Sequence, residues 1–276
     1  MERTRADVRV AAPVTAEVMA HALREAVKFL LFVRQQMPSS YDELRAALVD
    51  SVGAEGLGLP SQPEANSVSP DPNVGGKRKR VTSRERAATK LFKEVEKLLG
   101  CLTPELLRSS RPTEVALFLG STPNRPKEIF VFSLVRVQKN GYQPWIQSLD
   151  AEKRLGNSGR RLVRECLPAV ASAPIGVTTK AFLMMKAGVC LNGGTANDDT
   201  NDGTDPPPPG FLPKRGFEPN VKHTKVWCDF CIAPKDDDAR DSATSPDAGD
   251  ERERIWYQCT AAVKGLKTLK GVGNGL

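Results

Sequence analysis

The segment Thr15–Pro38, TAEVMAHALREAVKFLLFVRQQMP, decides the class of fold. Apolar residues recur along it at three-and-four spacing, which predicts a helix with a broad apolar face. Thr15 can cap the start of this helix, and Pro38 prevents its continuation. A helix with so much apolar surface must pack against other elements. Its apolar face is formed by Val18, Met19, Ala22, Leu23, Ala26, Val27, Leu30 and Leu31.

Further helices are expected after this one. Thr82 or Ser83 caps a helix that stops at Gly100, because glycine is common just beyond a helix end. Its apolar side is formed by Ala87, Ala88, Leu91, Phe92, Val95, Leu98 and Leu99. Another helix is expected over Ser158–Ala171, with Pro168 in its last turn.

The second half of the chain carries the signals of β-strands, which are short apolar or alternating runs bounded by Gly, Pro or acidic residues. Because helices come first and strands later, the order predicts an α+β fold rather than alternating βαβ units. We expect about five strands, at Val115–Leu119, Glu128–Val137, Val177–Ala187, Lys222–Ile232 and Ile255–Lys264.

Composition divides the chain into one expected domain and several loops. Residues 1–12 are expected to be a flexible N-terminus, and 13–270 a single domain. Tracts rich in Gly, Pro, Ser, Asn or Asp cannot bury enough apolar surface to offset the entropy lost on ordering. We therefore expect disordered loops within the domain at 51–80, 191–210 and 234–253.

The overall composition limits the classes of protein that fit. The chain has 276 residues, a formal net charge of +7 and a hydrophobic fraction of 39%, which is below the usual globular average. No apolar run is long enough to cross a bilayer, and the N-terminus is charged rather than apolar. We expect a soluble intracellular protein without membrane contact, whose six cysteines stay reduced.

The residues that usually carry catalysis are scarce. His21 and His223 are the only imidazoles, and the nucleophile-elbow, zinc-helix and phosphate-loop motifs are absent from the sequence. We therefore expect a protein that is not an enzyme and needs no cofactor. Cys228 and Cys231 form a CxxC pair that could bind a metal, with His223 among the candidates for a further ligand. The strand pattern favours core cysteines instead, because residues three apart in a strand point to opposite faces.

A basic tract, Lys77-Arg78-Lys79-Arg80, precedes the helix that begins near Ser83, and residues 77–97 contain nine Lys or Arg against three Glu. This tract could be a nuclear import signal, a phosphate-binding patch for nucleic acid, or a solvated helix face. Its one aromatic residue, Phe92, lies on the apolar side of the helix, so base stacking has no candidate residue. The import signal is therefore the favoured interpretation.

Several separated segments together resemble the comet family, HORMA-like proteins that bind the spindle-checkpoint protein Mad-two. Their order along the chain matches the order in the family. The matching segments are Arg34-Gln35-Gln36-Met37-Pro38 with Tyr41, Glu43 and Leu44; Arg125-Pro126-Lys127-Glu128; Arg160-Arg161-Leu162; Pro213-Lys214; and Ile255-Trp256-Tyr257-Gln258 with Val263, Lys264 and Gly265.

The resemblance implies a HORMA-like domain with about three helices packed on a mainly antiparallel sheet. It implies an adaptor that binds the closed conformer of Mad-two and presents it to the pachytene-checkpoint AAA+ ATPase. The expected result is disassembly of the mitotic checkpoint complex and silencing of the spindle checkpoint. A meiotic role on other HORMA proteins is a further expectation. The implied location is nucleus and cytoplasm, with spindle or kinetochore association in mitosis.

The resemblance also implies roles for particular residues. Pro213 and Lys214 are expected to contact the ATPase. Val33 and Val163 stand where vertebrate members of the family have Gln and Phe. The residues expected to contact Mad-two are Val33, Arg34, Gln35, Arg160, Arg161 and Val163. The alternative function is a basic nuclear protein that binds nucleic acid or chromatin through residues 77–97.

Overall fold

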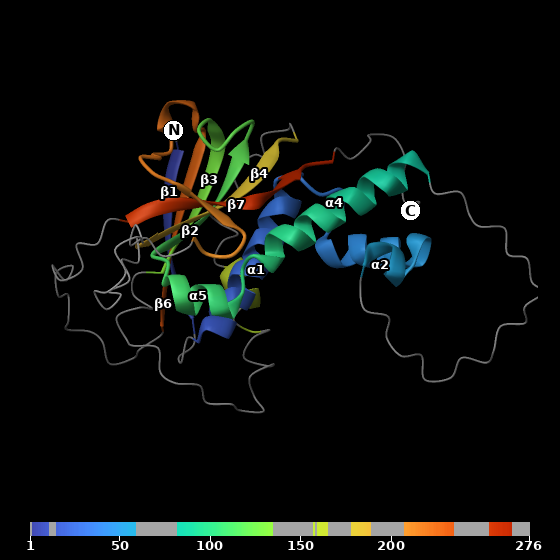
Figure 1. Ribbon diagram of the computed structural model, residues 1–276, viewed down its shortest axis with the longest axis horizontal. Helices are drawn as coiled ribbons and strands as arrows, with labels where there is room; N and C mark the ends of the chain where they lie inside the picture. Colours follow the sequence, from blue (N-terminus) through green and yellow to red (C-terminus); the bar gives the residue numbers. More distant parts are fainter. Residues whose placement is uncertain are drawn as a thin grey trace, which may run out of the picture.

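The computed structural model describes residues 2–10, 15–58, 82–134, 157, 159–164, 178–188, 207–234 and 254–266. These residues form an α+β structure with one mixed sheet and several helices (Figure 1). The α+β class predicted from the order of helices and strands is therefore confirmed.

The sheet has seven strands in the order β1-β6-β3-β2-β4-β7-β5. β6 pairs in parallel with β1 and with β3, while the remaining neighbours are antiparallel. All five expected strands are present, with ends that differ by a few residues in the described part. The strands are β1 (Glu2–Val10), β2 (Glu114–Gly120), β3 (Pro126–Ser133), β4 (Lys180–Gly188), β5 (Phe211–Lys214), β6 (Val226–Pro234) and β7 (Arg254–Lys264).

The helices gather on one side of the sheet (Figure 1). They are α1 (Ala16–Val33), α2 (Tyr41–Val52), α3 (Ala54–Leu57), α4 (Ser83–Gly100) and α5 (Pro104–Ser110). Residues 159–164 are also helical, within the expected third helix, and the rest of Ser158–Ala171 lies outside the described residues. A single 3-10 turn, η1 (Val221–His223), precedes β6.

Side-chain caps fix where the helices begin. Thr15 accepts a hydrogen bond from the backbone N–H of Val18, as the sequence predicted for α1. Thr82 and Glu85 form a reciprocal capping box at α4, and Ser40 and Glu43 form another at α2. Each cap satisfies backbone donors that would otherwise lack a partner.

The core lies between α1 and the sheet. All eight residues predicted for the apolar face of α1 are buried, and Ala16 and Ala20 are buried as well. The helix is therefore enclosed on most sides, as expected of a central helix. The opposite face of the sheet holds a smaller apolar cluster, which includes Phe118 and Trp256 and receives Phe217 from the segment between β5 and β6.

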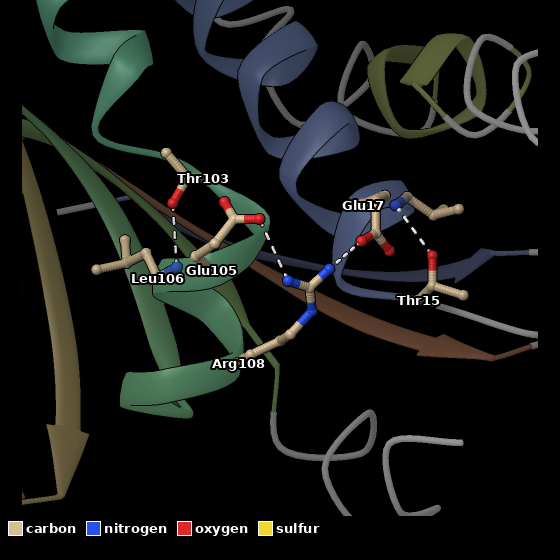
Figure 2. Close-up of polar contacts among 7 residues, drawn as sticks. Thr15, Glu17, Thr103, Glu105, Leu106 and Arg108 are labelled. Carbon is tan, nitrogen blue, oxygen red and sulfur yellow. Dashed lines mark hydrogen bonds and ion pairs between the residues drawn. The ribbon is translucent and has the colours of Figure 1, made fainter. Parts of the chain in front are cut away.

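An ion-pair network joins α1 to α5 (Figure 2). Arg108 on α5 pairs with Glu17 in the first turn of α1 and with Glu105, 3.2 Å away, in its own first turn. Thr103 caps α5 by accepting a hydrogen bond from Leu106 at 3.0 Å. Both acidic residues lie near helix N-termini, where negative charge is favoured.

The expected flexible N-terminus is wrong for residues 2–10, which form β1. Val8 is fully buried and Ala6 packs against the core, while Arg3, Arg5 and Asp7 are exposed. The charges lie on the outward face, and Arg3 donates a hydrogen bond to Asp229 on β6 at 3.0 Å. Alternation of charged and apolar residues is a strand pattern, and parallel pairing with β6 supplies its backbone partners.

The expected loops need correction at their ends. Residues 51–52 end α2 and residues 54–57 form α3, with turns at Gly53 and Gly58 and with Leu57 buried. Pro234 likewise ends β6, and the last residues of the 191–210 tract precede β5. The rest of the expected loops, at 59–80, 191–206 and 235–253, lies outside the described residues.

Tyr41, at the start of α2, contacts residues of both α1 and α4. Its ring stacks on Phe92 of α4 at 5.5 Å, its hydroxyl donates a hydrogen bond to Glu96, and the Lys28 ammonium of α1 lies 4.4 Å from its ring centre. Burial raises the pKa of the Tyr41 phenol, and the hydrogen bond to Glu96 raises it further. The protonated phenol is therefore a tie between α1, α2 and α4.

We predict that Tyr41→Phe lowers the free energy of unfolding by about 1–2 kcal/mol, because a hydrogen bond to a carboxylate is lost while the ring stays packed. The protonated phenol contributes this stability fully below about pH 10, the ordinary tyrosine pKa, and loses it as the pH rises through the higher folded-state value. Urea titrations at pH 7 and pH 10.5 measure both effects.

Glu96→Gln is the matched control for this test. A double-mutant cycle should show that Tyr41→Phe and Glu96→Gln are strongly non-additive, since both weaken the same hydrogen bond between Tyr41 and Glu96. Additive losses would contradict the tie between α2 and α4.

Candidate functional site

The C-terminal end of α1 is closed by the Arg34-Gln35-Gln36 segment. The Gln36 N–H donates to the Leu31 carbonyl at 2.8 Å, and Gln35 has a left-handed backbone with φ of 55°. This is the Schellman arrangement that ends many helices, usually with glycine at the left-handed position. The geometry turns Gln35 out to solvent and directs the side chains of Arg34 and Gln36 into the protein.

Arg34 forms a buried ion pair with Glu128 of β3. The side chains are 1% and 2% exposed, and Nε of Arg34 lies 3.3 Å from Oε2 of Glu128. The guanidinium also lies 5.4 Å from the ring centre of Phe130 on the same face of β3. Two buried charges are tolerated here because each compensates the other.

Gln36 links two further segments to the same place. Its side-chain amide donates to the Arg34 carbonyl at 2.7 Å and accepts from the Thr179 N–H, just before β4, at 2.9 Å. Its backbone carbonyl accepts from Leu266, beyond β7, at 3.0 Å. A Cβ at Gly265 would lie 2.4 Å from the Gln36 side-chain oxygen, so a larger residue there would have to displace the Gln36 amide from its hydrogen bonds.

These contacts define a polar node formed by Arg34, Gln36, Glu128, Thr179 and Gly265. It joins the end of α1, the start of β3, the start of β4 and the end of β7. Three of the segments that carry the family resemblance, which begin at Arg34, Arg125 and Ile255, meet in it.

The node changes the expectation for Arg34. Its side chain is held in the interior by Glu128, so it is not a surface residue that can contact a partner in this structure. Arg34 is a positioning residue that orients the end of α1. Val33 is partly buried against the core, and Gln35 is exposed.

Phe32 is an exposed aromatic residue beside this segment that sequence reasoning missed. Its side chain is 41% exposed, which is unusual for phenylalanine on a helix that is otherwise buried. Helical spacing places it on the same side of α1 as His21, Glu25 and Lys28. Phe32 lies outside the three-and-four spacing of the apolar residues of α1. An aromatic residue off the apolar face was the signal in the sequence that pointed to an exposed position.

The 159–164 helix packs against that side of α1. A Cβ at Gly159 would lie 2.9 Å from the Glu25 side chain and 3.3 Å from His21, so the two helices approach closely there (Figure 2 shows them side by side). Leu162 anchors the helix with a fully buried side chain. Burial is the main cause that lowers the pKa of His21, with Glu25 opposing it.

The predicted contact residues on this helix are accessible. Arg160 is exposed, and Arg161 and Val163 are partly exposed. We use the name α1 surface for the accessible residues at the C-terminal end of α1 and on the 159–164 helix that packs beside α1: Phe32, Val33, Gln35, Arg160, Arg161 and Val163. It combines aromatic, aliphatic and arginine side chains, the types enriched at protein interfaces.

Pro213 and Lys214 lie on β5, an edge strand of the sheet, and both are exposed, as is Leu212 at 54%. Phe211 is buried and holds the start of β5 in place. Just beyond β5, Phe217 lies 6.4 Å from Trp256 and 6.2 Å from Phe118 between ring centres. This aromatic group fixes the edge that presents Lys214.

The CxxC pair has the strand geometry that was predicted. Cys228 is fully buried in β6 beside Val226 and Phe230, whereas Cys231 is partly exposed on the other face. Within the described residues, no group of three or more His, Cys, Asp or Glu side chains is close enough to hold a metal ion. In the same part of the chain, no helix is both long and apolar enough to cross a bilayer.

The basic tract is described only from residue 82 onward, and Lys77–Arg80 lie outside the described residues. On α4, four exposed cations follow one side of the helix, at Arg86, Lys90, Lys93 and Lys97. They border a groove of about 620 Å³ between α4 and the end of α2, lined by Val52, Arg86, Thr89, Lys90, Lys93, Glu94 and Lys97.

Comparison with known proteins adds no assignment. No family model matches the chain, and no curated protein matches it.

We predict that Arg34→Ala lowers the free energy of unfolding by about 3–5 kcal/mol, because it leaves Glu128 charged and buried without its ion-pair partner. The paired change Arg34→Met with Glu128→Leu should recover most of this loss, since both charges are then removed. Chemical denaturation measures each variant.

Arg160→Ala is the surface control and should change stability by less than about 0.5 kcal/mol. A cost for Arg34→Ala as small as that of the control would show that Arg34 faces solvent.

Proposed function

We propose that the chain is a HORMA-like adaptor of the comet type that carries out no chemistry of its own. It binds the closed conformer of Mad-two and presents it to an AAA+ ATPase, which promotes disassembly of the mitotic checkpoint complex. The observation that carries the proposal is the polar node, because three segments chosen by resemblance alone meet there through Arg34, Gln36, Glu128 and Gly265.

The polar node gives a physical reason why these matching residues occur together in one chain. Residues that form one buried polar cluster depend on one another, since each leaves another unsatisfied when it is lost. A set of unrelated chance matches would have no cause to converge. Tyr41, which also belongs to the family resemblance, adds a further link because it joins the start of α2 to Phe92 and Glu96 of α4.

The α1 surface is the proposed binding face for Mad-two. Phe32 and Arg160 are the exposed members of the two types that most often dominate interface energy, aromatic and arginine side chains. Val33 and Val163 supply the apolar contact where the family has Gln and Phe. Because the buried Arg34 and Leu162 hold the two supporting helices, the face is organised before the partner arrives.

The β5 edge is the proposed contact for the ATPase. Lys214 and Pro213 are exposed on a strand that pairs with β7 only, so its other edge is open among the described strands. The two proposed contacts lie on different elements, which allows one partner to be held while the other acts.

We predict that the full chain co-purifies with Mad-two locked in its closed form and that Arg160→Glu weakens this binding at least tenfold. Charge reversal at an interface arginine removes its contacts and adds repulsion or desolvation, and tenfold corresponds to about 1.4 kcal/mol. Isothermal titration calorimetry measures the affinity.

Lys93→Glu on α4 is the matched control, because it makes the same charge change on another exposed helix face. It should leave the affinity within about twofold. No binding at micromolar concentration by a folded wild-type chain would overturn the proposal, and equal weakening by both variants would remove the α1 surface from it.

We predict that Lys214→Ala leaves Mad-two binding intact and slows ATPase-driven release of Mad-two severalfold. Lys225→Ala, at an exposed lysine outside β5, is the control and should change neither activity. A release assay with the purified ATPase measures the rate. Parallel loss of binding and release in Lys214→Ala would contradict the division between the two contacts.

One observation favours a second function, the binding of nucleic acid. The cations Arg86, Lys90, Lys93 and Lys97 share one side of α4 and border the groove against α2. Such a stripe would bind phosphates with a steep salt dependence, because cations are released from the nucleic acid. Mobility shifts at two salt concentrations test it: salt-sensitive binding that Lys90→Gln and Lys93→Gln together reduce would support this function.

A further inference from the structure

Cys101 and Cys259 bring two thiols together from distant parts of the chain. Cys101 caps the C-terminus of α4, and Cys259 lies in the middle of β7, 158 residues later. Their sulfur atoms are 3.1 Å apart. Neither the CxxC motif nor the proposed adaptor function involves this pair, and sequence spacing gives no sign of it.

The surroundings give the two thiols different roles. Cys101 is partly exposed, whereas Cys259 is buried with 1% exposure. Cys259 donates a hydrogen bond to the Cys101 sulfur, and this bond is the main cause that lowers the pKa of Cys101 to about 7. Lys97, one turn back on α4, acts in the same direction. Cys101 is thus the more accessible and the more acidic of the two thiols, and Cys259 is the one that keeps its proton.

We propose that Cys101 and Cys259 are a redox modification site that hydroperoxides convert to an intramolecular disulfide. The Cys101 thiolate attacks the peroxide, the O–O bond breaks, and Cys101 becomes a sulfenic acid while an alcohol, or water from hydrogen peroxide, is released. The Cys259 sulfur then attacks the Cys101 sulfur, the S–O bond breaks, and water leaves with the Cys259 proton. Two thiols are oxidised and one peroxide is reduced.

The site is built so that the second step follows the first. The sulfurs must approach from 3.1 Å to the disulfide length of about 2.05 Å, which is a small adjustment at a helix end. Gly210, which precedes β5, lies against Cys101, since a Cβ there would be 3.2 Å from the sulfur. The Thr260 N–H donates to the Gly210 carbonyl at 2.9 Å, so this backbone covers the pair from the β5 side.

The bond would join α4 to the sheet. The Lys264 N–H already donates to Glu94 on α4 at 3.1 Å, so β7 and α4 touch at two places along their length. A disulfide at the second contact, between Cys101 and Cys259, would close a long loop of chain. Such a loop restricts the unfolded state and so stabilises the folded one. Oxidation should therefore raise the melting temperature of the whole chain by several degrees.

The test treats the full, reduced chain with a small excess of hydrogen peroxide and maps its peptides by mass spectrometry without reduction. The expected result is one linked peptide pair that contains Cys101 and Cys259, has lost two hydrogens and is restored by dithiothreitol. Cys228→Ser and Cys231→Ser should give the same pair, because the sulfur that Cys101 contacts is that of Cys259.

Two variants separate the roles of the thiols. In Cys259→Ala, Cys101 should accumulate as a sulfenic acid that dimedone traps. In Cys101→Ser, Cys259 should stay reduced under the same treatment. Circular dichroism checks that both variants fold. If either variant does not fold, the peptide map of the wild-type chain still tests the proposal. A wild-type chain in which Cys101 pairs with another cysteine, or in which both thiols stay free for alkylation, would overturn the proposal.

Discussion

The buried pair of Arg34 and Glu128 is the interaction on which the arrangement of the other elements depends. It fixes the end of a helix whose sides are almost wholly enclosed, so α1 has little freedom to slide or rotate. Gln36 extends the constraint to the start of β4 and the end of β7. An ion pair of this kind is costly to desolvate and is retained only where its geometry is well satisfied, and it specifies one register of α1 against the sheet.

The node also separates residues that resemblance alone treats as one motif. Within Arg34-Gln35-Gln36, the backbone turns at the left-handed Gln35, so the first and third side chains point inward and the second outward. Loss of Arg34 or Gln36 would therefore disturb binding through the fold, whereas loss of the Gln35 side chain would act on the surface. Gly is the natural test residue at position 35, because it relieves the left-handed backbone while it removes the side chain.

Sequence reasoning succeeded where a local period is strong and failed where the deciding contact is distant. The apolar spacing of α1 and the Cys228 and Cys231 faces of β6 followed from helical and strand periods. β1 was missed because Arg3, Arg5 and Asp7 conceal the alternation of Ala6 and Val8, and α2 because only Leu44 and Leu48 of its residues are buried. No period predicts that Arg34 meets Glu128, so a buried arginine was assigned to the surface.

β7 links the proposed ATPase contact at Lys214 to the proposed disulfide between Cys101 and Cys259. It pairs with β4 on one side and β5 on the other, and its second half lies along α4 between Cys259 and Lys264. Since β5 pairs with no other described strand, the position of Lys214 depends on β7 remaining in the sheet. A bond between Cys101 and Cys259 would hold β7 against α4 and so hold the edge that presents Lys214. Any force applied at β5 would then be transmitted to α4 through a covalent link rather than through packing alone.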